Sequence, residues 1–410
     1  MKPGAVPGAL AGSRRQTVTS KTPKFDTLAI HGASKRKNPK HALNYPIFMT
    51  STFSFDSIEE AEYTFTNETD NYIYTRGNNP TLRVLEEKIA ALEGGSAAVA
   101  FASGMAAIST ALFSLLTPGD ELLSNNVLYG SANNVVNSIL PRYHIKSRRV
   151  DFTNLQALAD AVTEDTKVLF FETPCNPNLA IIDIEAVCNL ARQRGIKVVV
   201  DNTFATPYLQ QPLALGADVV VHSATKYISG HGDVVAGLAV ARDKEYVNSL
   251  KFDFMCEFGG VMSPFNGWLL LRGLKTLGLR MREHCRNALA VARYLQQHPR
   301  VRKVYYPGLP DFPGHDIARR QMRDFGAMIS FDLDGSVEES RQVVEKLQLI
   351  KLAVSLGDCE TLVVHPFAMT HRSYSPEELA AAGLTPSMIR LSIGLEAVED
   401  ILADLDQALA

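Results

Sequence analysis

The chain has few cysteines and almost no net charge, and each of these features excludes some classes of protein. Its five cysteines form an odd set with no C-x-x-C pair, which argues against a disulfide framework and a zinc module. We therefore expect a reducing, cytoplasmic location. Lys and Arg number 41 against 44 Asp and Glu, a net charge of -3. Such a chain has no overall field for a polyanion, so nucleic acid is not expected as a partner.

Evidence for a membrane span or a signal peptide is also lacking. The uncharged stretch at 96–119 is rich in Ala and contains Gly, Ser, Thr and Pro. A buried strand, a turn and a core helix account for it better than a bilayer helix does, so no membrane partner is expected. Residues 1–25 are poor in aromatics and have no apolar signal core, which predicts a disordered leader. A transit peptide is the open alternative for this leader.

What the sequence does contain is an alternation of short apolar runs with helical patterns. Apolar strands that alternate with helices are typical of a mostly parallel sheet covered by helices on both faces. We therefore predict an α/β fold with an extended arm at 26–75, a large domain at 76–262 and a smaller α+β domain at 263–410. The expected strands are 97–101, 167–171, 197–200, 219–221 and 328–333. The expected helices are 82–92, 106–116, 184–194, 209–215, 264–278, 281–297, 337–347 and 397–408.

A lysine placed directly after an apolar strand is the most informative chemical feature. Lys226 follows the run 219–221 and small hydroxyl residues, and three glycines come within the next twelve positions. A lysine in an apolar pocket can lose its proton and act as a nucleophile. Taken alone, Lys226 is more simply interpreted as a surface residue after an edge strand.

Two further features lie where open α/β sheets place ligand contacts. Asp201 ends the apolar run 198–200, and a buried carboxylate there needs a cationic partner, which a protonated pyridine nitrogen would supply. A helix cap is the plainer role for this aspartate. At Ser103-Gly104-Met105 a strand meets a helix, and helix N-termini bind phosphate. Each signal is weak alone, and no histidine or cysteine spacing indicates a metal site.

Together these features resemble a pyridoxal phosphate (PLP) enzyme of fold type I, similar to aspartate aminotransferase. The chain is more specifically similar to the Cys/Met-metabolism family of PLP enzymes over residues 26–410. The matching motifs are YTRGNNPT (74–81), SGMA (103–106), LYG (128–130), VDNT (200–203), SATKY (223–227), AVSLG (353–357) and IRLSIGLE (389–396). Segments 229–233, 277–281, 306–309, 369–371 and 373–378 resemble the branch of methionine γ-lyases and cystathionine γ-lyases.

The resemblance implies a role for each matched residue. Lys226 would link covalently to the cofactor and shuttle protons, Asp201 would hold the pyridinium nitrogen, and Tyr129 would stack on the ring and protonate the leaving thiol. The implied phosphate contacts are Gly104, Met105, Ser223 and Thr225, with Tyr74 and Arg76 reaching the phosphate of a neighbouring subunit. Asn176, Ser355 and Arg390 would hold the substrate carboxylate, Arg390 in a two-pronged contact. The resemblance further implies a homotetramer, a dimer of dimers with shared active sites.

The expected activity is a carbon–sulfur lyase reaction by γ-elimination on a small sulfur amino acid such as L-methionine. Two departures from methionine γ-lyases weaken the claim for methionine. Ser131 stands where those enzymes typically have cysteine, and the stretch 254–260 lacks their Lys-Asp pair. A cystathionine or homocysteine γ-lyase, or a γ-replacement enzyme (O-acetylhomoserine sulfhydrylase or cystathionine γ-synthase), would share the same motifs. A PLP fold without catalysis is a third alternative, against which the intact Lys226, Asp201, Tyr129 and Arg390 argue.

Overall fold

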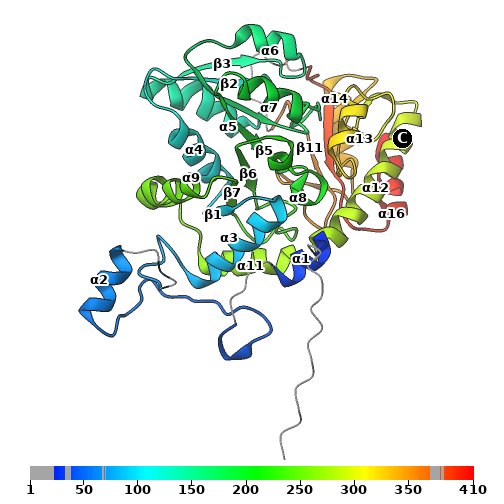
Figure 1. Cartoon of the computed structure of the whole chain (residues 1–410). Helices are drawn as coiled ribbons and strands as arrows, with labels where there is room; N and C mark the ends of the chain where they lie inside the picture. The colour runs from blue at the N-terminus through cyan, green and yellow to red at the C-terminus, as the bar shows by residue number, and fades with distance from the viewer. Residues whose placement is uncertain (1–22, 33–37, 67–68, 70, 370–378, 380–382) are drawn as a thin grey trace, which may run out of the picture.

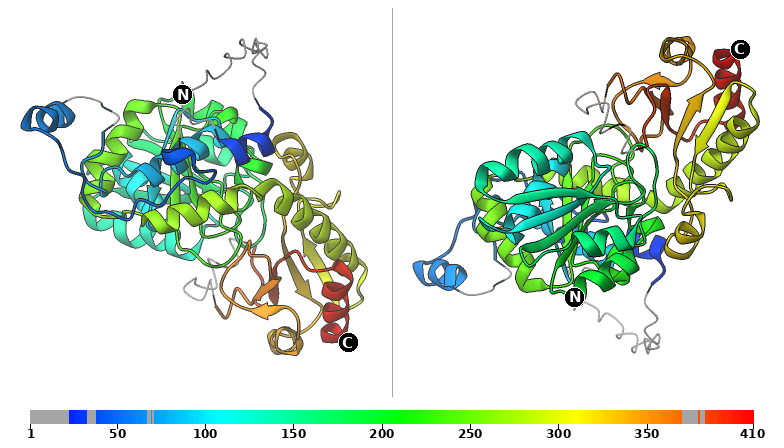
Figure 2. Two further views of the ribbon diagram at one scale, coloured as in Figure 1. Left: turned by 90° about the horizontal axis from the view of Figure 1, so that it is seen from below. Right: turned by 90° about the horizontal axis from the view of Figure 1, so that it is seen from above.

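The computed structural model describes residues 23–32, 38–66, 69, 71–369, 379 and 383–410. The predicted leader lies almost wholly outside this part of the chain, as do most of the motifs at 369–371 and 373–378. Two sheets dominate the described residues (Figures 1 and 2). One lies within 76–262 and the other within 263–410, while the exact domain boundaries stay predictions.

The large sheet has seven strands, and only one of them runs against the others. β7 pairs antiparallel with both β1 and β6, whereas the strands from β6 to β3 pair in parallel. The mostly parallel central sheet is therefore confirmed. In spatial order its strands are β1 (Ala97–Phe101), β7 (Gly237–Ala241), β6 (Val219–Ser223), β5 (Lys197–Asp201), β4 (Thr166–Glu172), β2 (Glu121–Asn125) and β3 (Lys146–Val150).

Helices cover both faces of this sheet because successive strand residues point to opposite sides. In β5, Val198 and Val200 join the core beneath one set of helices, while Val199 joins the core on the other face. The helices on the first face include α3 (Pro80–Glu93), α6 (Leu155–Ala161), α7 (Ile184–Arg192), α8 (Thr206–Leu209) and α11 (Pro264–Leu274). Those on the second are α4 (Gly104–Leu115), α5 (Gly130–Asn134) and α9 (Lys244–Ser249), with α10 (Cys256–Phe258) following nearby.

Helix α3 shows how local sequence sets these elements. The Asn79 side chain accepts a hydrogen bond from the Thr81 N–H at 3.0 Å, Pro80 takes the first helical position, and Gly94 ends the helix at φ 73°. These are the preferred cap residues at each end. Leu85 and Ile89 on its inner face are fully buried, each worth roughly 1.5–3 kcal/mol by transfer from water.

The second sheet is smaller and largely antiparallel, with a parallel pair at one edge between β10 and β11. Figure 2 shows it beside the large domain, together with the long helix α12. Its strands in spatial order are β10 (Lys351–Leu352), β11 (Leu362–Val364), β12 (Met388–Ser392), β9 (Met328–Leu333) and β8 (Val301–Tyr305). Its helices are α12 (Leu277–Gln297), α13 (His315–Gln321), α14 (Val337–Lys346) and α16 (Val398–Leu409).

Three predicted elements needed correction. The helix expected at 209–215 is split into α8 and a 3-10 turn at Pro212–Leu215, because Pro212 follows the end of α8. The break between the two long helices falls after Leu274 rather than after 278. The arm, expected to be extended, carries the helices α1 (Phe25–His31) and α2 (Ile58–Thr66).

These two arm helices lie in different surroundings. Helix α1 docks on the body, where the Lys88 ammonium donates to the carbonyl oxygen of Ala29 at 2.9 Å. Helix α2 stands away from the body (Figure 1) and exposes Ile58, Tyr63 and Phe65. No helix among the described residues is both long enough and apolar enough to cross a membrane.

Candidate active site

A cavity of about 270 Å³ lies where the carboxyl ends of β4, β5 and β6 meet. This is the edge at which open α/β sheets bind ligands. Residues from the second sheet's domain close its other side. The residues expected from the sequence that line it are Lys226, Tyr129, Asp201, Gly104, Met105, Ser223, Thr225, Asn176, Ser355 and Arg390.

Lys226 follows β6 and presents its amine to this cavity. The amine donates to the Ser355 hydroxyl oxygen at 3.3 Å. Burial, and then the positive charge of Arg390, lower the pKa of Lys226, while the Asp358 carboxylate opposes both. A lowered pKa increases the fraction of neutral amine, which is the nucleophilic form. The surface-residue interpretation of Lys226 therefore does not fit its position.

Asp201 ends β5 with its carboxyl group buried beside the cavity. Its Oδ1 accepts hydrogen bonds from the backbone N–H of Thr203 at 2.9 Å and from the Thr203 hydroxyl. Burial raises the pKa of Asp201, and the two Thr203 hydrogen bonds and the charge of His222 oppose that rise. A buried carboxylate that faces a cavity is stabilised by a cationic ligand group, which the helix-cap interpretation of Asp201 would not provide.

Glu172, which the sequence analysis missed, ends the neighbouring strand β4 beside Asp201. The strand register pairs these two residues directly. Glu172 accepts from the backbone N–H of Asn176 at 3.0 Å. Burial, and then the Asp201 charge, raise the pKa of Glu172 well above its ordinary range. The two acids therefore favour different protonation states, with Asp201 the more readily ionised.

The N-terminus of α4 forms the end of the cavity that suits a phosphate. The Ser103 side chain caps this helix by accepting from the Ala106 N–H at 3.1 Å. The first amide groups of a helix have no carbonyl partner within it, so they can bind an anion. A Cβ on Gly104 would lie 2.7 Å from Ser223 Cβ, so only glycine allows this approach. The Thr225 hydroxyl lines the cavity and also bonds the backbone of Ala236.

Arg390 lies on β12 and reaches the cavity from the second sheet. One guanidinium nitrogen donates to Asn176 Oδ1 at 2.7 Å and the other to the Ser355 carbonyl oxygen at 3.2 Å. Its Nε is buried and has no hydrogen-bond partner among the described residues. Burial lowers the pKa of Arg390 to about 10, which leaves it protonated at neutral pH. A buried cation with a free donor fits a carboxylate ligand.

Tyr129 and the arm residues Tyr74 and Arg76 lie differently with respect to the cavity. The Tyr129 side chain lines it and is partly exposed, at the start of α5. Tyr74 and Arg76 do not line the cavity of their own chain. Arg76 donates to the Cys256 carbonyl oxygen at 3.0 Å, and its guanidinium lies 5.9 Å from the centre of the Tyr74 ring.

The sequence analysis missed several further lining residues besides Glu172. Thr203 could have been found, because it belongs to the segment 200–203 that was already recognised. The apolar contacts come from side chains with no chemical signature of their own. These missed lining residues are Ile108, Pro174, Thr203, Phe204, Val235, Val354 and Leu356.

The arrangement fits the expected cofactor. It combines the Lys226 amine, whose pKa is lowered, with the buried carboxylate of Asp201 and the capped helix N-terminus at Gly104, which has small neighbours. These groups suit an aldehyde, a ring nitrogen and a phosphate respectively. Among the described residues no cluster of histidine, cysteine and acidic side chains could hold a metal ion.

Comparison with known proteins agrees with this geometry. The model of the Cys/Met metabolism PLP-dependent enzyme family matches residues 26–410. An L-methionine gamma-lyase of Fusobacterium nucleatum subsp. polymorphum is 50% identical, covering 93% of this chain and 97% of the relative. A cystathionine gamma-lyase of Dictyostelium discoideum is 42% identical, covering 94% and 97%. The crystal structure of a Xanthomonas oryzae pv. oryzae cystathionine gamma synthase has a TM-score of 0.90 at 42% identity, covering 95% and 98%.

Proposed function

Since the chain belongs to the Cys/Met metabolism PLP-dependent enzyme family, we propose that it is a carbon–sulfur lyase that eliminates methanethiol from L-methionine. Water completes the reaction, which leaves 2-oxobutanoate and ammonia. The observation that carries this proposal is the meeting of Lys226, Asp201, Tyr129 and Arg390 around one cavity. A noncatalytic member of the fold would have no use for a depressed lysine pKa beside a buried arginine.

Each of these residues has a distinct task in the proposed reaction. When bound, PLP supplies an electron sink for the carbons of the substrate. Arg390 binds the α-carboxylate and fixes the direction of the Cα–H bond. The Lys226 amine, with its lowered pKa, removes the proton from Cα and later takes part in the proton transfer at Cβ. Tyr129, at the mouth of the cavity, gives its phenolic proton to the departing sulfur.

A substrate panel tests the activity. L-methionine, L-homocysteine, L-cystathionine and O-acetyl-L-homoserine would each be assayed for release of 2-oxobutanoate, with and without an added thiol. We expect L-methionine to give the highest kcat/KM and an added thiol to leave the yield of 2-oxobutanoate unchanged. Preference for cystathionine or homocysteine would indicate a γ-lyase for those substrates. A thioether product formed from O-acetyl-L-homoserine at the expense of 2-oxobutanoate would instead indicate γ-replacement.

Arg390→Lys should reduce activity although it keeps the positive charge. Lysine lacks the planar fork that matches a carboxylate while also holding Asn176 and the Ser355 carbonyl. We expect a loss of about 1–3 kcal/mol, or roughly 5- to 150-fold in kcat/KM for L-methionine. Arg282→Lys, which alters an exposed ion pair with Asp26, is the matched control. An unchanged kcat/KM in Arg390→Lys would remove this residue from the substrate site.

The proposal includes a homotetramer built from two dimers with shared active sites. Tyr74 and Arg76 lie away from their own cavity, and the arm exposes Leu43, Met49 and Phe65. Exposed apolar side chains on a projecting arm are typical of an interface between chains. A cytoplasmic location is part of the same proposal, supported by five free cysteines.

Mixing two inactive variants tests the shared site. Arg76→Ala and Lys226→Ala should each be nearly inactive alone. In a hybrid dimer one of the two sites would regain both wild-type residues, so activity should partly return after subunit exchange. Native mass spectrometry would verify that hybrids form. Verified hybrids without activity would mean that Arg76 acts within its own chain, and a fully active monomer in sedimentation would exclude the shared site altogether.

A further inference from the structure

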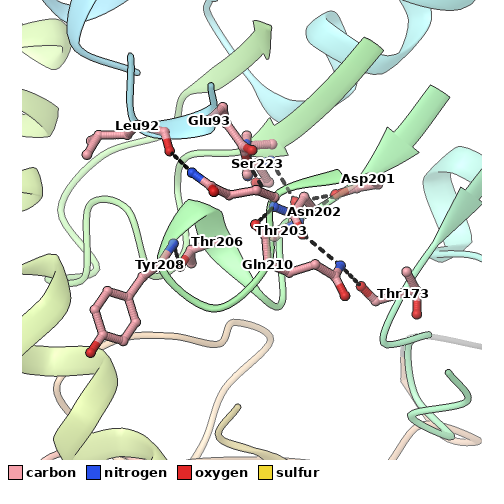
Figure 3. Close-up of polar contacts among 12 residues, drawn as sticks. Leu92, Glu93, Thr173, Asp201, Asn202, Thr203, Thr206, Tyr208, Gln210 and Ser223 are labelled. Carbon is pink, nitrogen blue, oxygen red and sulfur yellow. Dashed lines mark hydrogen bonds and ion pairs between the residues drawn. The ribbon is translucent and has the colours of Figure 1, made fainter. Parts of the chain in front are cut away.

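A buried polar cluster lies directly behind the cavity, formed by Glu93, Asn202, Gln210 and His222. Glu93 ends α3, His222 lies on β6, and Asn202 follows Asp201 at the end of β5. All four are at most 2% exposed. Figure 3 shows Glu93, Asn202 and Gln210 next to Asp201, Thr203 and Ser223 of the cavity. The cluster therefore touches the chain segments that carry the site.

Glu93 is the centre of this cluster. Its Oε1 lies 2.6 Å from His222 Nε2 and accepts a hydrogen bond from Asn202 Nδ2 at 2.9 Å. Asn202 Nδ2 also donates to the Gln210 carbonyl oxygen at 2.9 Å, and Gln210 Nε2 donates back to Asn202 Oδ1 at 3.0 Å. One carboxylate oxygen thus contacts a side chain on β6 and a side chain just beyond the end of β5, immediately beside Asp201.

Folding stability alone does not account for this pair. Glu93 Oε2 and His222 Nδ1 are buried and have no hydrogen-bond partner among the described residues. Each such atom carries an uncompensated desolvation cost, and a buried ion pair is often no more stable than apolar side chains of similar volume. A costly pair next to a cavity indicates a role in that cavity.

The pair reaches the cavity through Asp201. The Thr203 hydroxyl donates to Asp201 and accepts from the Ser223 N–H at 2.8 Å, which ties the end of β5 to the residue after His222. Two other titratable groups lie on the strands beside Asp201. The charge of His222, from β6, opposes the burial that raises the pKa of Asp201, and Glu172, from β4, is a neighbouring acid. Lys226 and Arg390 face the same cavity.

We propose that Glu93 and His222 form a carboxylate–imidazolium pair that positions Asp201 and keeps its carboxylate ionised for the cofactor. Glu93 and His222 are positioning residues, because they act through Asp201 and do not line the cavity. The proposal rests on the role given above to Asp201, but it concerns cofactor affinity and is independent of which sulfur amino acid reacts.

The pH dependence of PLP affinity follows from this arrangement. PLP binds the ionised carboxylate, so its Kd rises as pH falls through the pKa of Asp201 in the apoenzyme. Loss of the positive charge at His222 removes one of the groups that oppose burial, leaving only the Thr203 hydrogen bonds, and therefore raises that pKa. The pH at which Kd begins to rise should therefore move upward when either member of the pair is made neutral.

The experiment titrates the apoenzyme with PLP and follows its fluorescence across the pH range in which circular dichroism shows a folded protein. His222→Gln removes the cation, and Glu93→Gln removes its counter-charge. Glu86→Gln is the matched control. Glu86 lies on the same helix as Glu93, and the substitution removes its ion pair with Lys251 at 2.7 Å. Titration of PLP itself is common to all variants and cancels.

We expect the midpoint pH of the rise in the Kd of PLP to increase by about one pH unit in both His222→Gln and Glu93→Gln. In Glu86→Gln this midpoint pH should stay unchanged. If His222→Gln does not fold, Glu93→Gln decides alone. An unchanged or lowered midpoint in Glu93→Gln, or an equal rise in Glu86→Gln, would overturn the proposal. Asp201→Asn separates this failure from a failure of the site: if it binds PLP with the wild-type pH dependence, the role of Asp201 itself is wrong.

Discussion

Lys226→Ala is expected to abolish turnover, with a loss of at least about 10⁴-fold in kcat, because in the proposed reaction the lysine provides both the covalent link to the cofactor and the base for Cα. Its amine lies beside Ser355, and burial and Arg390 lower its pKa. The proposed phosphate site around Gly104 is separate from this amine, so PLP should still bind, but more weakly. Steady-state release of 2-oxobutanoate measures the loss.

Two controls sharpen this result. Lys226→Arg keeps a positive charge at the same position but cannot lose its proton, so it should be as inactive as the alanine variant. Borohydride reduction of the wild-type holoenzyme should attach a pyridoxyl group to Lys226, detectable in the peptide by mass spectrometry. More than trace elimination activity in Lys226→Ala, or a label on another lysine, would show that the nucleophile is assigned wrongly.

The second large effect is expected for Asp201→Asn, which keeps the shape of the side chain and removes its charge. In the proposed site, a neutral amide would leave the ring nitrogen of the cofactor without its counter-charge. Breaking a buried pair in this way costs about 3–5 kcal/mol, equivalent to roughly 10²- to 10⁴-fold in kcat/KM. The backbone N–H of Thr203 still donates to the remaining oxygen, so the fold around β5 should survive.

Asp201→Glu provides the comparison for this loss. Glutamate retains the charge but extends the carboxylate further into the cavity, so activity should be partly retained. Thermal unfolding of each apoenzyme would show whether the substitution affects stability rather than the reaction. Full activity of Asp201→Asn with saturating PLP would refute the proposed contact between this carboxylate and the ring nitrogen.

The residues at strand ends could be located from the sequence, because a polar residue after an apolar run marks the binding edge of a parallel sheet. Asp201 and Lys226 were found in this way. Glu172 gives the same signal directly after the predicted strand 167–171, and applying the rule consistently would have found it. Arg390 and Ser355 were found only through family motifs, because nothing local indicates that the second sheet turns these residues toward the first.

Other features carry no sequence signal. Strand β2 has the sequence Glu-Leu-Leu-Ser-Asn, and all five residues are buried although three of them are polar. Its Glu121 is accommodated because the Arg148 guanidinium lies 2.6 Å away and lowers the pKa of Glu121 to about 2. Glu93 and His222 are likewise 129 positions apart in the chain. Such pairings depend on tertiary contacts, which periodicity and composition do not describe.

If the proposed reaction is correct, the position of Arg390 also decides which form of methionine can react. Its guanidinium is buried between two sheets and held by Asn176 and the Ser355 carbonyl, and its buried Nε has no partner among the described residues. In the proposed site this cation binds a carboxylate. A free amino acid supplies that carboxylate. A methionine inside a polypeptide has its carboxyl group in an amide bond, which would leave the arginine facing a neutral carbonyl and would bring further chain into a small cavity. A lyase of the proposed kind would therefore consume the pool of free methionine while leaving the methionines of folded and nascent proteins intact.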